Sequence, residues 1–157
     1  MRKHFVLLLV LVLCITLLSG CGAKERSAPH VYEDLTIRLP ITFLDLSDTT
    51  YGAEYDFLWG MEPITVSGLR DDKSLFEAYN LNLEGYGMLV MVMNSLDCTL
   101  SQTDGIWNFS YEADGYTYLV TLRETEKAFW TVQAYCPTED YPQEKDQMWE
   151  ILRSVTK

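Results

Sequence analysis

The clearest pattern along the chain is an alternation of apolar and polar residues in its second half. Period-two alternation places every second side chain on the same face, as in a half-buried strand. The pairs Asp104-Gly105 and Asp114-Gly115 separate the alternating segments and suit tight hairpin turns, because glycine tolerates the positive φ that such turns require. The pattern predicts an antiparallel meander, opened by a short strand near 98–103. Its longer strands are expected at 106–112, 116–122 and 130–136.

A helical spacing of apolar residues follows the predicted meander. Apolar side chains from Met148 to Val155 recur at intervals of three and four residues, which places them on one helix face. Pro142 suits the first turn of a helix, where its missing amide hydrogen costs nothing. The pattern predicts a helix over 142–155, which would cover one face of the sheet.

The middle of the chain combines helical spacing with glycine. The sequence Ser-Leu-Phe-Glu at 74–77 resembles a capping box, in which Ser and Glu bond to each other's backbone amides. A second apolar helical stripe begins at Leu83, although Gly85 and Gly87 each weaken a helix by about 1 kcal/mol relative to Ala. We expect a helical segment here. Two earlier strands are expected at 35–39 and 61–69.

The N-terminus has the pattern of an export signal. Arg2 and Lys3 precede an apolar run that ends in the small residues Ser19 and Gly20, directly before Cys21. A transmembrane helix needs roughly 20 apolar residues, and this run is shorter, so removal fits better than a membrane span. We interpret residues 1–20 as a signal peptide that is cleaved between Gly20 and Cys21.

The order Leu-Ser-Gly-Cys at the end of this run resembles the lipobox of bacterial lipoprotein signal peptides. The resemblance implies that the thiol of Cys21 carries a lipid anchor, which holds the protein on the extracytoplasmic face of the cell membrane. An ordinary secretory signal with a coincidental cysteine is the alternative. Residues 21–33 then form the lipidated cysteine and a small, polar, flexible tether, and residues 34–157 suit one domain.

Charge restricts the partners of the exported chain. Without Arg2 and Lys3, ten basic residues of the twelve remain against 23 acidic residues, so the net charge is 10 minus 23, or −13. Nucleic acid requires cationic side chains that replace its counterions, and we expect no nucleic-acid partner. The acidic residues also suit a soluble exported domain. Membrane attachment is therefore expected through Cys21 alone.

Histidine chemistry is scarce in the mature chain. Its single histidine, His30, lies in the predicted tether, which leaves Ser-His-Asp, Cys-His and His-rich zinc sites without support. We expect no catalytic residues, no metal site and no cofactor. Two alternatives stay open: an envelope hydrolase that uses paired carboxylates, and a calcium-binding surface protein, although no acidic segment has the spacing of an EF-hand loop.

Two cysteines remain beyond the lipobox. An even pair in an exported domain favours a disulfide, so Cys98 and Cys136 are the candidate pair. Within one meander they would lie three strands apart, roughly 14 Å at standard strand spacing, whereas bridged Cα atoms lie within about 7 Å. The bond therefore requires Cys98 to lie in the connection before the first strand of the meander. Two free buried thiols are the alternative.

The aromatic residues divide into two groups. Most occupy alternating strand positions or helix stripes, where the core needs bulky side chains. Four others lie in the stretch 44–60, which shows no clear period. We expect these four to provide exposed contacts with a partner. They are Tyr51, Tyr55, Phe57 and Trp59.

The order of these elements is similar to that of a known family. The segments that carry the likeness are Leu39-Pro40, 68–70, the aromatic meander, 129–133 and 149–155. The chain resembles the PsbP-like α/β/α sandwich domains, and more narrowly small lipoproteins of anaerobic Gram-positive bacteria that carry such a domain. The resemblance implies an α+β fold, an antiparallel meander covered by helices. It also implies a noncatalytic module that binds or stabilises an envelope protein.

Overall fold

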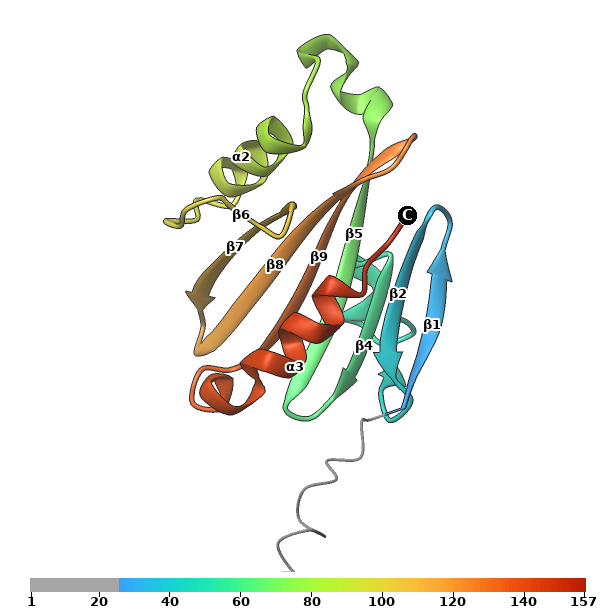
Figure 1. Cartoon of the computed structure of the whole chain (residues 1–157), viewed down its shortest axis with the longest axis vertical. Coiled ribbons are helices and arrows are strands. Elements are labelled where there is room, and N and C mark those ends of the chain that lie inside the picture. The colour runs from blue at the N-terminus through green and yellow to red at the C-terminus, as the bar shows by residue number, and fades with distance from the viewer. Residues whose placement is uncertain (1–25) are drawn as a thin grey trace, which may run out of the picture.

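An antiparallel sheet lies at the centre of the structure (Figure 1). The computed structural model describes residues 26–157; the predicted signal peptide, Gly20 and Cys21 lie outside this range. In the described chain the sheet has seven strands in the order β3-β4-β5-β9-β8-β7-β6. The strands are β3 Leu44–Asp45, β4 Phe57–Met61, β5 Ile64–Asp72, β6 Ser101–Thr103, β7 Ile106–Ala113, β8 Tyr116–Glu124 and β9 Ala128–Pro137.

The predicted meander is confirmed. Strands β6 to β9 pair in sequence as antiparallel neighbours. Asp104 and Gly105 have φ values of 52° and 78°, and Asp114 and Gly115 have 52° and 83°. Two consecutive residues with positive φ are the requirement of a type I′ hairpin turn. The turn residues therefore fix where each hairpin closes.

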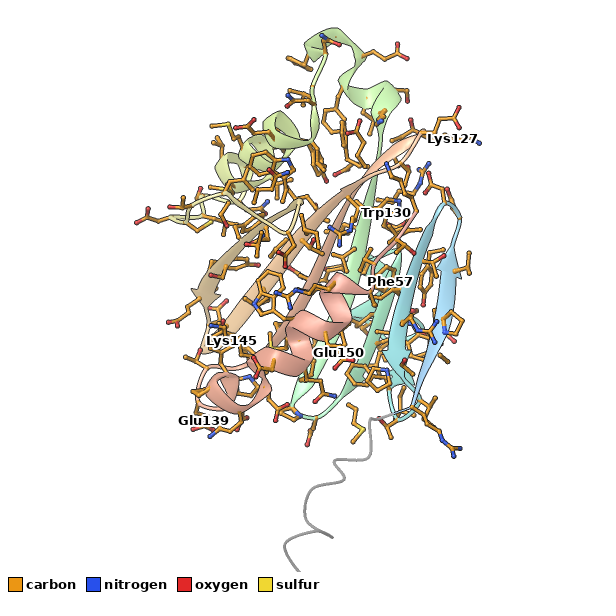
Figure 2. The ribbon with its side chains drawn as sticks, viewed as in Figure 1. Phe57, Lys127, Trp130, Glu139, Lys145 and Glu150 are labelled. Atoms are coloured by element: carbon orange, nitrogen blue, oxygen red, sulfur yellow. The ribbon has the colours of Figure 1, made fainter. Side chains whose placement is uncertain are left out.

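One face of the sheet, here the α3 face, packs against a helix and a hairpin. The helix α3 (Tyr141–Arg153) lies across β8 and β9, and a separate hairpin of β1 (Ser27–Tyr32) and β2 (Leu35–Pro40) lies beside it (Figure 1). Side chains of the hairpin, α3 and the sheet form one buried cluster. Figure 2 shows Phe57 and Trp130 within this interior. The predicted C-terminal helix is confirmed.

The opposite face, here the α2 face, carries the short 3-10 helix η2 (Lys73–Tyr79) and the helix α2 (Leu83–Met93). Tyr86 of α2 packs against apolar residues of β7, β8 and β9. Gly87 permits this close approach, because a Cβ there would lie 2.5 Å from Cδ1 of the buried Leu122. Gly87 would weaken an isolated helix, but in the folded protein it lets α2 pack closely against the sheet. None of the helices in residues 26–157 is long and apolar enough to cross a membrane.

The start of the η2 segment differs from the predicted capping box. Asp72, not Ser74, is the N-cap: its Oδ1 accepts a hydrogen bond of 2.9 Å from the backbone N of Ser74. The α2 helix is capped separately by Asn82, whose Oδ1 accepts from the backbone N of Gly85 at 2.8 Å. The two helical pieces therefore each begin with their own cap, an aspartate for η2 and an asparagine for α2.

Part of the predicted tether is an ordered strand. Residues 27–32 form β1 and pair with β2 in the register Ser27↔Pro40 to Tyr32↔Leu35. His30, expected as a solvated tether residue, lies against Trp59 with ring centroids 4.3 Å apart. The flexible tether is thus wrong for residues 27–32. Pairing with the neighbouring strand β2 and contact with β4, which is distant in sequence, order a segment whose own composition is polar and small.

The candidate disulfide is absent from the structure, where Cys98 and Cys136 are both free. Cys136 is buried in the α3-face cluster, with its Sγ 3.6 Å from Sδ of Met148. Cys98 packs against the cluster on the α2 face. The sheet itself separates the two thiols, and burial raises the pKa of each. The connection before β6 does not carry Cys98 across the sheet.

Candidate functional site

A cleft lies between α2 and the sheet, and we call it the α2 cleft. It has a volume of about 450 Å³, which is within the range of small-molecule sites. The helix has 11 residues, and β8 beneath it has nine. At standard rises these are about 16 Å and about 30 Å long, so α2 covers only part of the strands. The apolar walls of the cleft are Leu69, Phe76, Leu89, Val90, Met93, Leu96, Phe109 and Val120.

The polar side of the α2 cleft is a hydrogen-bonded trio. The hydroxyl of Tyr86 donates to Oδ2 of Asp71 at 2.6 Å and lies 2.9 Å from Oγ1 of Thr131. Tyr86 is 1% exposed and its ring stacks on Phe129. Burial raises the pKa of Tyr86 above its ordinary value, and the bond to Asp71 raises it further. A neutral phenol therefore holds the Asp71 carboxyl in position.

Asp71 is the one charged side chain among the described residues that line the α2 cleft. No second carboxylate lies beside it there, whereas glycoside hydrolysis uses two. Across residues 26–157, no group of three or more His, Cys, Asp and Glu side chains is arranged to hold a metal ion. The chemistry of the cleft is thus that of one carboxylate among apolar and aromatic groups.

A row of three tyrosines continues from the α2 cleft over the open part of the sheet. Tyr111, Tyr118 and Tyr135 are cross-strand neighbours on β7, β8 and β9. Their ring centroids are 4.6 Å and 4.9 Å apart, with interplanar angles of 1° and 27°. Burial, followed by neighbouring groups, raises the pKa of Tyr111 and of Tyr135 to about 12. Tyr118 stacks with both Tyr111 and Tyr135, so both of its faces are occupied by its neighbours.

The four predicted contact residues are not brought together as one exposed patch. Tyr51 is 80% exposed, and Tyr55 lies half-buried at the edge of the α2 cleft. Phe57 is 0% exposed and stacks on Tyr32 under the hairpin, so its predicted exposure is wrong. Trp59 is half-buried and its Nε1 donates to the hydroxyl of Tyr32. The reason is that β4 directs Phe57 and Trp59 toward β1, a strand that the sequence pattern does not show.

An apolar surface on η2 and α2 is a feature that the sequence analysis missed. Five large side chains there are 58–75% exposed and line or flank a groove of about 550 Å³. The signal was present in the run from Met88 to Met93, which has no polar residue. A helix that is apolar on all sides buries only the side that faces the sheet. We call this set the outer α2 surface: Leu75, Tyr79, Met88, Val92 and Met93.

Comparison with known proteins supports the fold. No model of a protein family matches the chain, and no curated protein matches it in sequence. Among solved structures, it is similar to the solution structure of cyanobacterial PsbP (CyanoP) from Synechocystis sp. PCC 6803. The TM-score is 0.57 at 8% sequence identity, over 87% of this chain and 95% of that chain. The expected PsbP-like α+β fold is confirmed.

Proposed function

We propose that the protein is a noncatalytic binding module, anchored through lipid on Cys21 at the extracytoplasmic face of the cell membrane. It docks an envelope protein through the outer α2 surface. The observation that carries the proposal is the clustering of five large apolar side chains, each 58–75% exposed, on η2 and α2. Burial of one such side chain contributes about 1.5–3 kcal/mol. A partner that covers the set has a substantial driving force.

The position of the surface favours a protein over the supporting bilayer. The described chain begins at Arg26 beside the start of β1, at the opposite end of the molecule from η2 and α2 (Figure 1). Cys21 precedes Arg26 by five residues, a reach of about 18 Å when fully extended. An anchor at that end leaves the outer α2 surface directed toward the envelope space.

The PsbP-like fold agrees with a noncatalytic role. The similar solved structure is a cyanobacterial PsbP by its printed name, and the single carboxylate of the α2 cleft gives no paired acid and base. The net charge of −13 after signal removal favours a partner with basic side chains around its apolar patch.

Site-specific cross-linking tests the docking surface. A photo-reactive residue at Met88 in the full lipoprotein, expressed in native cells, is expected to give a discrete protein adduct. Val92→Glu should remove this adduct, because it places a charge in the apolar contact. Val31→Glu is the matched control, since Val31 is 69% and Val92 75% exposed but Val31 lies on β1.

The outcome separates docking from incidental contact. An adduct that survives Val92→Glu, or no protein adduct at all, contradicts the proposal. Replacement of Cys21 by Ser tests the anchor separately: it should move the protein from the membrane fraction to the soluble fraction. An unchanged membrane fraction would contradict lipid attachment at Cys21.

A further inference from the structure

The α2 cleft combines a fixed carboxylate with apolar and aromatic walls, a combination that protein docking on the outer surface does not require. We propose that the cleft binds a small ligand with a protonated amine on an apolar body. The ammonium group lies against Asp71, and the apolar body lies between α2 and the sheet. This inference goes beyond the proposed function, since it assigns a second site to the module, which shares the lining residues Phe76, Leu89 and Met93 with the groove of the outer α2 surface.

The charge of the site selects a cation. Asp71 is the one charged lining residue in the described chain, and neither Lys nor Arg lines the cleft. Removal of a carboxylate from water is costly without a compensating partner, and the hydroxyl of Tyr86 supplies one hydrogen bond to Oδ2. An ammonium donor from a ligand adds a charge-assisted bond to the same group. The acidic surface of the protein draws cations toward it.

The apolar and aromatic lining of the cleft favours an apolar body for the ligand. Phe76, Phe109 and Tyr111 contribute aromatic rings, and Leu69 and Leu89 contribute aliphatic surface. Cations are attracted to aromatic faces, and apolar groups gain by leaving water. A second ammonium would have no carboxylate in these walls, so a monoamine fits better than a diamine. A hard metal ion prefers six or more oxygen ligands, which this cleft does not supply.

The shape of the site is already formed in the unliganded chain. Thr131 and Asp71 hold the Tyr86 hydroxyl from both sides at 2.9 and 2.6 Å. Phe129 stacks under the Tyr86 ring with centroids 4.7 Å apart. A carboxylate that is positioned before binding loses little freedom when the ligand arrives, which favours affinity.

Three probes of matched size test the inference. Isothermal titration calorimetry uses the full lipoprotein in phosphatidylcholine nanodiscs, with empty nanodiscs as the reference. Phenethylammonium is expected to bind at least tenfold more tightly than 2-phenylethanol, because both fill the apolar walls and only the amine pairs with Asp71. The anion 3-phenylpropanoate should not bind. Equal affinity for the amine and the alcohol would overturn the proposal.

The variant Asp71→Asn tests whether the negative charge of the carboxylate is needed for amine binding. The variant should lower phenethylammonium affinity at least tenfold while 2-phenylethanol affinity stays unchanged, since an amide oxygen can still accept from Tyr86. Glu77→Gln is the matched control: it removes an exposed carboxylate of η2 that does not line the cleft. Retained amine affinity in Asp71→Asn would contradict the site. If that variant does not fold, the comparison of the three probes on the natural chain remains decisive.

The variant Leu69→Trp tests whether the ligand binds between the apolar walls of the cleft. Leu69 is 39% exposed on β5, so the larger ring can enter the cleft without entering the core. The variant should bind neither phenethylammonium nor 2-phenylethanol. If it binds both with the affinity of the natural chain, the ligand site lies elsewhere. The docking proposal is tested separately, because Val92→Glu should abolish the Met88 adduct and leave amine binding intact. Failure of one proposal is therefore distinguishable from failure of the other.

Discussion

The two faces of the central sheet are built from the same strands, yet they are covered to different extents. On the α3 face, α3 and the β1–β2 hairpin together bury one continuous cluster. On the α2 face, α2 and η2 cover a smaller cluster and leave a cleft and a row of tyrosines beside it. The difference fits the division of roles that we propose, with stability concentrated on the α3 face and binding on the α2 face.

The covering helices differ in the same way. Helix α3 has Met148, Ile151 and Leu152 buried, whereas polar residues form most of its remaining surface. Helix α2 buries Tyr86 and Gly87 but exposes Met88 and Val92. An amphipathic helix needs no further partner, whereas a helix that is apolar on both sides leaves surface for one.

The largest expected effect is on the α3 face. Trp130→Ala removes a side chain that is 1% exposed and whose Nε1 donates to Oδ1 of Asp34 at 3.0 Å. We expect the free energy of unfolding to fall by about 3–5 kcal/mol, as for large aromatic residues in cores. Urea titration monitored by circular dichroism measures it. A loss below about 1 kcal/mol would contradict the assignment of stability to this face.

The next effect is pH-dependent and belongs to the tyrosine row. Because the pKa of Tyr111 and of Tyr135 is raised to about 12 in the folded chain, the folded state holds these protons more tightly than the unfolded state, whose tyrosines titrate near about 10. Their contribution to stability is therefore fully present below about pH 10 and lost as the pH rises through about 12. The melting temperature should fall over this window.

A double variant tests the origin of that fall. Tyr111→Phe with Tyr135→Phe keeps the rings and removes the ionisable groups, so the melting temperature should decline less between pH 10 and 12. Tyr79→Phe is the control, because Tyr79 is 73% exposed on η2. An unchanged decline in the double variant would show that other groups cause it.

A change in the packing of α2 against the sheet is expected to have a smaller effect on the free energy of unfolding. Gly87→Ala places a Cβ 2.5 Å from Cδ1 of Leu122 and 3.0 Å from Cδ2 of Leu100. Overpacking costs about 1–3 kcal/mol, and the gain in helix propensity of about 1 kcal/mol offsets part of it. We expect a net loss of about 1 kcal/mol in urea titration. Gly85→Ala in the same helix is the control and should cost less than Gly87→Ala, because its Cβ would come no closer than 3.3 Å to Oδ1 of Asn82 and Cδ2 of Leu81.

The meander and α3 were predictable because their signals are local. Alternation, the Asp-Gly turns and the helical spacing lie within short stretches of sequence, and the structure places the strands and the helix where they indicate. The strand β1 was not predictable in this way. Residues 27–32 are ordered by β2 and by the contact of His30 with Trp59, and neither contact has a sequence pattern of its own.

The candidate site was less predictable than the fold. Asp71, Tyr86 and Thr131 come from β5, α2 and β9, and only the topology joins them. The disulfide prediction failed for a related reason, since spacing gives the distance between strands but not the face on which Cys98 packs. The outer α2 surface did have a local signal, the unbroken apolar run from Met88 to Met93.

The smallest expected effect is that of Val92→Ala on the α2 face, and Val132→Ala on the α3 face gives the comparison. Val132 is 0% exposed on β9, and Val92 is 75% exposed on α2. Val132→Ala should lower the free energy of unfolding by about 2 kcal/mol through lost burial. Val92→Ala should change it by less than about 0.5 kcal/mol, because alanine favours helix and the lost side chain contacts mainly water.

Val92→Ala also connects stability to function. Since the variant keeps the fold, a weaker cross-link from Met88 in native cells can be assigned to the lost contact with a partner rather than to unfolding. A loss of stability in Val92→Ala equal to that in Val132→Ala would mean that the outer α2 surface is buried in the free protein. The contrast between the two faces would then be wrong, and the docking proposal would lose its main support.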